Sequence, residues 1–292
     1  MDVETFEAER SRLFGIAYRM LGSAADAEDI VQDAWIRCRA VDTADIERPP
    51  AYLTTITTRL AIDRLRSAQS RRETYVGPWL PEPIVTADDP ADMAALGDSV
   101  TFGFLSVLDR LSPVDRAVFL LREVFDMPYP EVAAVVDRSE TACRQIASRA
   151  RSRVRAERPS VSIDADRRSE LLGAFLGAVA SGDIDQLEQL LTDDIVLVSD
   201  GGPNARAARR PVVTPPRVAR LMSNLYRRAG ASVDLELIEA NGQPALYVSA
   251  GNEPVLLLTI DPDSTGERVQ RVWVVVSPEK LAGVAERLGE RR

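Results

Sequence analysis

Two short amphipathic segments followed by an arginine-rich helix constrain the fold of this chain more than any other feature. Ser112 is an N-cap residue followed directly by proline, a pair typical of a helix start. The apolar stripe that follows is interrupted at Pro128, and a second helical pattern runs over residues 129–136. Ser139 offers a new N-cap for a third helix. This spacing predicts a helix-turn-helix.

The predicted third helix carries an unusual local charge. Between Arg138 and Arg158 there are seven arginines and two acids, a local charge of +5 in a protein of net charge −9. Ala142, Ile146 and Ala150 recur every four residues and are expected to pack on the preceding helix. The opposite side bears groups that bond phosphates and base edges in the major groove. These are Arg144, Gln145, Ser148, Arg149 and Arg151. The alternative is an arginine-rich helix that is merely solvated.

A second basic helix lies upstream and follows an acidic one. Residues 46–72 hold six arginines against two acids, with an apolar stripe of leucine and isoleucine facing a core. In residues 26–37 one face is apolar and the other is loaded with carboxylates. The basic helix suits nucleic acid, and its acidic neighbour suits a basic protein surface.

Three of these stretches together resemble a known family. DAEDIVQDAW, AYLTTITTRLAIDRLR and LSPVDRAVFLLREVFDMPYPEVAAVVDRSETACRQIASRAR are similar, in the right order, to regions two and four of extracytoplasmic-function (ECF) sigma factors. WLPEP, residues 79–83, resembles a signature of the ECF subclass that carries an extra C-terminal domain, the sigma J type.

The resemblance implies a role for each part of the first 158 residues. The acidic helix docks on the clamp of core RNA polymerase through Asp29, Gln32 and Asp33. The next helix opens the minus-ten element of promoter DNA, and region four reads the minus-thirty-five element while its first helices rest on the polymerase flap. The arginines implied for region two are Arg48, Arg59, Arg64, Arg66, Arg71 and Arg72.

After residue 158 the pattern changes to an α+β domain. Two helical patterns end near residues 181 and 191, and five strand-like runs follow, separated by turn signals such as Asn241-Gly242. Thr214 is expected to cap one more helix, and residues 279–288 form the last. The order resembles a SnoaL-like cone. We therefore expect sigma region two at 1–72, a linker at 73–98, sigma region four at 99–158 and a SnoaL-like domain at 159–292. The fold class is multi-domain, with two all-α sigma domains plus an α+β cone.

The subclass resemblance also implies built-in regulation, with no separate anti-sigma factor strictly required. We expect the cone to pack against the linker, with Trp79 or Leu80 in an apolar groove, and so to set the spacing of regions two and four. Removing the last dozen residues should relieve inhibition. The residues concerned are Trp79, Leu80, Pro81, Glu82, Pro83, Asp200, Gly201, Gly202 and Lys280.

Other functional classes also fit parts of the sequence. Asp200, with Asp193 and Asp194 nearby, could supply a general acid, and the arginines at 206, 209 and 210 could hold an anion. A SnoaL-like enzyme or small-ligand sensor fused to a DNA-binding regulator therefore stays open, as does a conventional repressor. We predict no catalysis and leave a small ligand in the cone possible.

Composition also bears on which cofactors the chain can bind and on where in the cell it acts. The chain has no histidine, and its two cysteines, Cys38 and Cys143, lie far apart, so no metal site and no cofactor are expected. No apolar run approaches the length of a membrane span, and the N-terminal segment is acidic rather than basic. We expect a cytoplasmic protein with no membrane contact.

Overall fold

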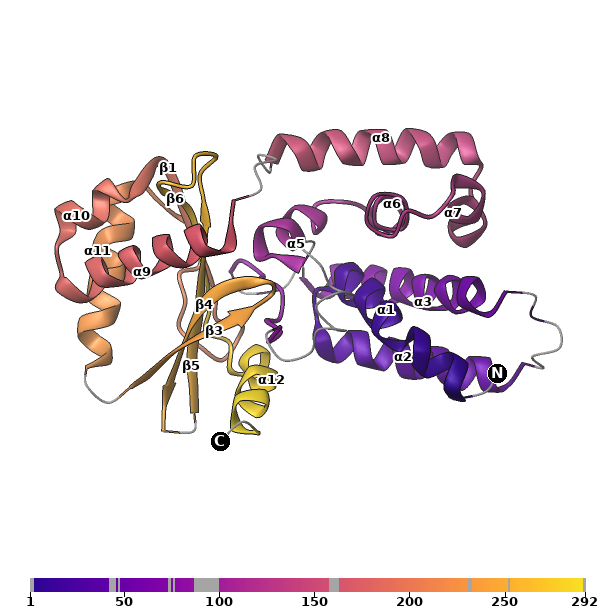
Figure 1. The fold of residues 1–292 in the computed structure, drawn as a ribbon, viewed down its shortest axis with the longest axis horizontal. Coiled ribbons are helices and arrows are strands. Elements are labelled where there is room, and N and C mark those ends of the chain that lie inside the picture. Colours follow the sequence, from indigo (N-terminus) through magenta and orange to yellow (C-terminus); the bar gives the residue numbers. More distant parts are fainter. Residues whose placement is uncertain are drawn as a thin grey trace. The chain divides into compact units, whose positions relative to one another are not determined.

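The computed structural model describes residues 3–41, 46, 48–72, 75, 77–86, 100–157, 163–230, 233–251 and 253–290, without the side chains of residues 68–72. The chain forms two compact units, one of Met1–Thr74 with Asp89–Arg158 and one of Tyr75–Asp88 with Pro159–Arg292 (Figure 1). The stretch Tyr75–Asp88 of the expected linker therefore belongs to the C-terminal unit. In the part of the chain that is described, no helix has the length and apolarity that crossing a bilayer requires.

Three helices pack on one another to form the region-two part of the first unit. They are α1 (Val3–Leu21), α2 (Ala24–Arg39) and α3 (Pro49–Arg72). The hydroxyl of Ser23 accepts a hydrogen bond from the backbone N–H of Asp26 at 3.2 Å, which caps α2 at its start. A buried cluster joins the three helices and consists of Phe6, Leu13, Val31, Cys38 and Leu53.

The region-four part of the first unit contains the predicted helix-turn-helix. Its elements are α5 (Phe102–Leu108), α6 (Pro113–Phe119), the π-helical turn η3 (Leu120–Val124), α7 (Tyr129–Val136) and α8 (Glu140–Glu157). The side chain of Ser112 accepts from the N–H of Asp115, and that of Ser139 accepts from the N–H of Ala142, both at 3.2 Å. Both predicted caps are therefore confirmed.

The buried face of α8 differs from the prediction. The fully buried line is Cys143, Ala147, Ala150 and Val154, whereas Ala142 and Ile146 are only half-buried. The prediction was right for Ala150 and wrong for Ala142 and Ile146. Residues at spacings of four drift around a helix of 3.6 residues per turn, and the observed spacings of four, three and four follow the buried side. Burial raises the pKa of the Cys143 thiol, and the same cause raises the pKa of the Cys38 thiol.

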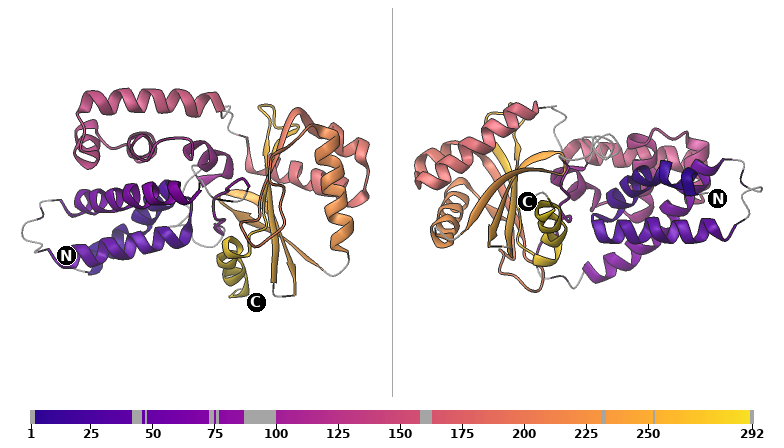
Figure 2. Two further views of the ribbon diagram at one scale, coloured as in Figure 1. Left: turned by 180° about the vertical axis from the view of Figure 1, so that it is seen from behind. Right: turned by 60° about the horizontal axis from the view of Figure 1, so that its bottom comes forward.

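The C-terminal unit is a curved sheet with helices on both faces (Figures 1 and 2). Its strands are in the order β2-β1-β6-β5-β4-β3, with β1 and β6 parallel and the other pairs antiparallel. The helices are α9 (Ala165–Ser181), α10 (Ile184–Gln189), α11 (Pro215–Ala229) and α12 (Pro278–Gly289). The strands are β1 (Leu191–Asp200), β2 (Val212–Val213), β3 (Asp234–Ala240), β4 (Gln243–Ala250), β5 (Glu253–Pro262) and β6 (Val269–Val275). The five predicted strands and the predicted fold class are confirmed.

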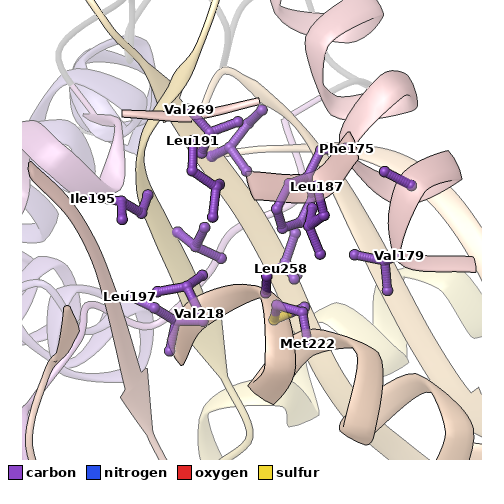
Figure 3. Close-up of a cluster of buried hydrophobic side chains, with 14 of the residues drawn as sticks. Phe175, Val179, Leu187, Leu191, Ile195, Leu197, Val218, Met222, Leu258 and Val269 are labelled. Atoms are coloured by element: carbon purple, nitrogen blue, oxygen red, sulfur yellow. The ribbon is translucent and has the colours of Figure 1, made fainter. Parts of the chain in front are cut away.

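The core of this unit lies between the sheet and the helices α9, α10 and α11. Phe175, Leu187, Leu197, Met222 and Leu258 are among its members, and Figure 3 shows these side chains pointing toward one another. Helix α12 covers the opposite face, where it packs on β5 (Figure 2). The face of the sheet that α9, α10 and α11 cover is therefore packed with apolar side chains.

One predicted cap in this unit is wrong. Thr214 precedes α11, but its side chain makes no capping hydrogen bond, and its backbone has a φ of 78°. The two-residue strand β2 ends directly before it, a pairing with β1 that the sequence pattern did not indicate. Thr214 turns the chain from this strand into the helix, and the proline after it begins the first turn.

Candidate functional site

Asp200, the last residue of β1, is the centre of a buried polar cluster. Its side chain is fully buried and accepts four hydrogen bonds. Oδ1 accepts from the hydroxyl of Tyr75 at 2.7 Å and from the N–H of Gly202 at 2.9 Å. Oδ2 accepts from the N–H of Leu80 at 2.7 Å and from Nζ of Lys280 at 2.6 Å. The carboxylate is saturated by donors, so the arrangement fits a structural anchor rather than a general acid.

Lys280 also bonds the backbone of Leu80. Its Nζ donates to the carbonyl oxygen of Leu80, while Asp200 accepts from the N–H of Leu80. The ammonium also lies 4.3 Å from the ring centroid of Trp79 and 5.3 Å from that of Tyr75. Leu80 itself is 1% exposed. We call this cluster the linker clamp, and it consists of Tyr75, Trp79, Leu80, Asp200 and Lys280.

A second attachment holds the linker to the end of β3. The N–H of Asn241 donates to the carbonyl of Ile84 at 2.9 Å, and the side-chain oxygen of Asn241 accepts from the N–H of Ile84 at 3.0 Å. The N–H of Thr86 donates to the carbonyl of Glu239 at 3.1 Å. Asn241 is fully buried with a φ of 54°, a conformation that asparagine tolerates better than most residues. The linker thus extends the sheet edge by a short strand-like pairing.

The glycines after Asp200 allow the close approach that the clamp needs. A Cβ on Gly202 would lie 3.2 Å from both the hydroxyl of Ser277 and that of Tyr75, and the φ of Gly202 is +59°. A Cβ on Gly201 would lie 2.6 Å from a backbone oxygen of the same turn. Within the signature itself, Pro81 and Pro83 are buried and Glu82 is half-buried. The structure therefore brings the predicted linker and turn residues into one cluster and adds Tyr75, which the sequence reasoning missed.

The acidic pair in the first half of β1 faces solvent. Asp193 and Asp194 are exposed, and Nε2 of Gln270 donates to Asp194 at 3.0 Å. Hydrogen bonds from Thr192 and Gln270 lower the pKa of Asp194, which favours a carboxylate over a proton donor. Among the residues that the structure describes, no group of histidine, cysteine or acidic side chains could hold a metal ion.

The proposed DNA-facing side of α8 is exposed at Arg144, Gln145, Ser148 and Arg149. Arg144 bonds Glu140 at 3.1 Å and lies 4.4 Å from the ring centroid of Tyr129. These contacts hold its guanidinium near the start of α8. Tyr129, the first residue of α7, was missed from the sequence, although an aromatic residue at the start of the helix before the arginine-rich one was a visible signal.

Arg151 is fixed by a bidentate pair instead of pointing freely into solvent. Its Nε and Nη2 donate to the two carboxylate oxygens of Glu123 at 2.8 and 2.6 Å. The hydrogen bond from Arg151 lowers the pKa of Glu123. Arg151 therefore links α8 to the π-helical turn. This structural role comes in addition to the phosphate contact that the sequence predicted for it.

Two of the arginines proposed for region two bond residues of region four inside the first unit. Arg59 donates from Nε to the carbonyl of Val135 at 3.0 Å and from Nη2 to that of Ala134 at 2.9 Å, at the end of α7. Arg48 pairs with Glu131 on α7 at 2.7 Å. In this state both side chains are held by region four.

Two further arginines of α3 pair within region two. Arg64 contacts Asp26 at 3.3 Å and Asp29 at 3.1 Å, and Arg66 contacts Asp63 at 3.2 Å. Both side chains stay partly or largely exposed. The side chains of Arg71 and Arg72 lie outside the described residues. Exposed pairs such as these contribute about 0–1 kcal/mol each, so phosphate oxygens can replace their carboxylates at little cost.

The proposed polymerase-facing side of α2 is exposed. Asp29, Gln32 and Asp33 all face solvent, and Asp29 keeps its contact with Arg64. Ile36, one turn further along, is 58% exposed. An apolar side chain at the end of an acidic stripe is a common element of protein interfaces, and the sequence reasoning did not single it out.

Comparison with known proteins agrees with this architecture. The family model for Sigma-70 region 2 matches residues 5–71, and that for Sigma-70, region 4 matches residues 103–154. The chain is 39% identical to the ECF RNA polymerase sigma factor SigJ of Mycobacterium tuberculosis over 303 residues, which cover 100% of this chain and 96% of that one. It is 30% identical to the probable ECF RNA polymerase sigma factor SigI of M. tuberculosis over 289 residues, covering 97% and 96%. The crystal structure of M. tuberculosis SigJ superposes with a TM-score of 0.76 at 35% identity, covering 97% of this chain and 99% of that chain.

Proposed function

The chain belongs to the ECF RNA polymerase sigma factor family, and from this premise we propose that its linker clamp regulates how it directs promoter-specific initiation by core RNA polymerase. The C-terminal domain acts as the built-in regulator, so that no separate anti-sigma factor is required. One observation carries the proposal: both polar groups of the Leu80 backbone are bonded by the C-terminal domain. The N–H of Leu80 donates to Asp200, and the carbonyl oxygen of Leu80 accepts from Lys280, which also bonds Asp200.

Each surface of the first unit has a proposed partner. The exposed side of α2 with Asp29, Gln32 and Asp33 docks on the polymerase clamp, and the first helices of region four rest on the flap. Helix α3 contacts the opened minus-ten strand, and α8 enters the major groove at the minus-thirty-five element. The exposed arginines on α8 and the exposed carboxylates on α2 support this division.

Docking shortens the segment that joins the two sigma regions. The expected linker, residues 73–98, could span about 90 Å if fully extended, whereas the part after Thr86 could span only about 40 Å. The clamp and the attachment at Asn241 fix Tyr75 to Thr86 on the C-terminal domain. A docked linker therefore limits how far regions two and four can separate, and a released linker removes that limit.

The compact first unit supports a closed resting state. In it, Arg59 and Arg48 bond region four and are not available to a DNA strand. Separating α3 from α7 would release both side chains. We propose that binding to polymerase requires this separation and that linker release favours it.

A transcription assay with core polymerase and the promoter upstream of the chain's own gene tests the proposal. Lys280→Met removes the ammonium that holds Leu80, so we expect promoter output to rise severalfold. Arg287→Met on the same helix α12 removes an exposed charge and serves as the matched control. Equal output from wild type and Lys280→Met would contradict regulation by the clamp. No promoter-specific output from any of the three proteins would contradict the initiation role itself.

A further inference from the structure

The C-terminal domain carries an exposed arginine surface that the linker clamp does not use. Residues 201–233 contain seven arginines and no acidic residue, within a chain of net charge −9. Four of the seven lie on α11, whose position in the helical layer is shown in Figure 1. All four are exposed.

The four arginines share one side of the helix. Val218, Ala219, Met222 and Ser223 define the buried side of α11. At 100° per residue, the four arginines and Asn224 fall within an arc of about 100° on the opposite side. The stripe runs roughly 16 Å along the helix axis. We call it the arginine stripe, and it consists of Arg217, Arg220, Asn224, Arg227 and Arg228.

Within the described residues, no carboxylate pairs with any arginine of the stripe. Arg227 bonds the side-chain oxygen of Asn224, and Arg217, Arg220 and Arg228 have no partner among those residues. Some arginines of other helices do pair with carboxylates: Arg144 pairs with Glu140 on α8, and Arg167 pairs with Glu170 on α9. A helix face that is merely solvated usually mixes charges of both signs.

The helix dipole explains only part of the stripe. Cations are favourable in the last turn of a helix, which accounts for Arg227 and Arg228, but a cation in the first turn opposes the positive end of the helix dipole. Arg217 stands in that first turn, where α11 has no acidic residue. Arg217 and Arg220 also repel each other at a spacing of three. The unfavourable placement of Arg217 and Arg220 is therefore relieved when an anion binds beside them.

We propose that the arginine stripe binds the phosphate backbone of duplex DNA, giving the C-terminal domain its own contact with the nucleic acid that the sigma regions engage. Guanidinium groups bond phosphates in bidentate fashion, and the amide of Asn224 is also a phosphate donor. Arginine is also enriched in protein interfaces, and Leu225 and Tyr226 of the same helix are 40% and 44% exposed. Both fall outside the arc of the arginines, so the stripe itself offers no apolar anchor and a protein partner is the weaker fit. Over roughly 16 Å a duplex presents about ten phosphates, enough for every guanidinium.

The test measures how the affinity of the full chain for a labelled 40-base-pair duplex depends on salt. The stripe variant is Arg217→Gln/Arg220→Gln/Arg228→Gln. The control variant, Arg167→Gln/Arg268→Gln/Arg287→Gln, removes the same charge from other surfaces of the same unit. Each phosphate contact adds about 0.9 to the slope of log affinity against log salt, so three lost contacts flatten it by about 2.7. Between 50 and 200 mM salt the wild type should then lose about 40-fold more affinity than the stripe variant.

The outcomes separate the sources of any effect. A flatter slope in the stripe variant alone supports the proposal. Equal flattening in both variants assigns the effect to net charge and overturns it. Unchanged duplex binding with weakened binding to core polymerase assigns the stripe to a protein partner and overturns it. Equal affinities of all three proteins, including no measurable binding at 25 mM salt, also overturn it, while the role of the linker clamp is untouched by any of these results.

Discussion

Replacing Leu80 by alanine should release the linker without altering the polar groups of the clamp. The side chain of Leu80 is 1% exposed, and its removal leaves the backbone bonds to Asp200 and Lys280 chemically possible. Truncation of a buried leucine to alanine costs about 2–5 kcal/mol. Because every 1.4 kcal/mol is tenfold in an equilibrium constant, the opening constant of the linker should rise at least about 30-fold.

Lys280 reports this opening directly because it is the chain's only lysine. In the docked state its side chain is 14% exposed, and its Nζ donates to Asp200 and to Leu80. An amine-reactive reagent should therefore label it mainly from the open state, at a rate proportional to the opening constant while reclosing is fast. Mass spectrometry of the peptide that contains Lys280 separates this signal from the N-terminal amine.

A matched control decides the interpretation. Leu237→Ala makes the same chemical change in the same unit, at a side chain that is 68% exposed on β3. We expect the labelling rate of Lys280 to rise about 30-fold or more in Leu80→Ala and to stay within threefold of wild type in Leu237→Ala. A rise below threefold in Leu80→Ala, or an equal rise in both variants, would refute the view that burial of Leu80 holds the linker.

Two further predictions concern the turn that contains Gly202 and the helix α8. Gly202→Ala should cost about 1–2 kcal/mol, because an alanine at a φ of +59° is disfavoured and its Cβ would meet Tyr75 and Ser277 at 3.2 Å, so Lys280 labelling should rise about tenfold; an unchanged rate would contradict this. The pKa of Glu123 is lowered by the hydrogen bond from Arg151, so the pair stabilises the fold above the ordinary glutamate pKa of about 4.3, and that stability is lost as pH falls through the lowered pKa. Glu123→Gln should therefore speed hydrogen exchange of α8 amides at pH 7 by no more than about fivefold, with the difference from wild type shrinking in acid; a difference that grows in acid would contradict the assignment.

Local signals in the sequence predicted the local elements well. The caps at Ser112 and Ser139 involve residues three apart, and the structure contains both. The strands were visible as apolar runs between turn signals. The buried line of α8 was misjudged because Cys143 and Ala147 face the core only once α6 and α7 fix the rotation of the helix, and that rotation is set by packing.

Contacts between distant residues were the part that the sequence pattern could not supply. Leu80 and Asp200 are 120 residues apart, and Arg59 lies 76 residues from Val135. No propensity or periodicity links such pairs, since they depend on where β1 ends and on how α3 meets α7. The resemblance to a family suggested that the linker and the C-terminal turn act together, but the donors and acceptors emerged only from the fold.

The chain contains exposed and buried ion pairs, and the two kinds respond differently to the loss of a partner. The pair of Arg144 with Glu140 leaves both side chains about half exposed, so water screens it and a phosphate can replace the carboxylate at little cost. The pair of Lys280 with Asp200 is buried, and losing one partner leaves an uncompensated charge at a cost of about 3–5 kcal/mol. The guanidinium of Arg144 can therefore exchange Glu140 for a DNA phosphate with only a small change in free energy. The buried pair keeps the linker docked until the peptide of Leu80, its hydrogen bonds and the ring of Trp79 leave together, so release of the linker should be an all-or-none event.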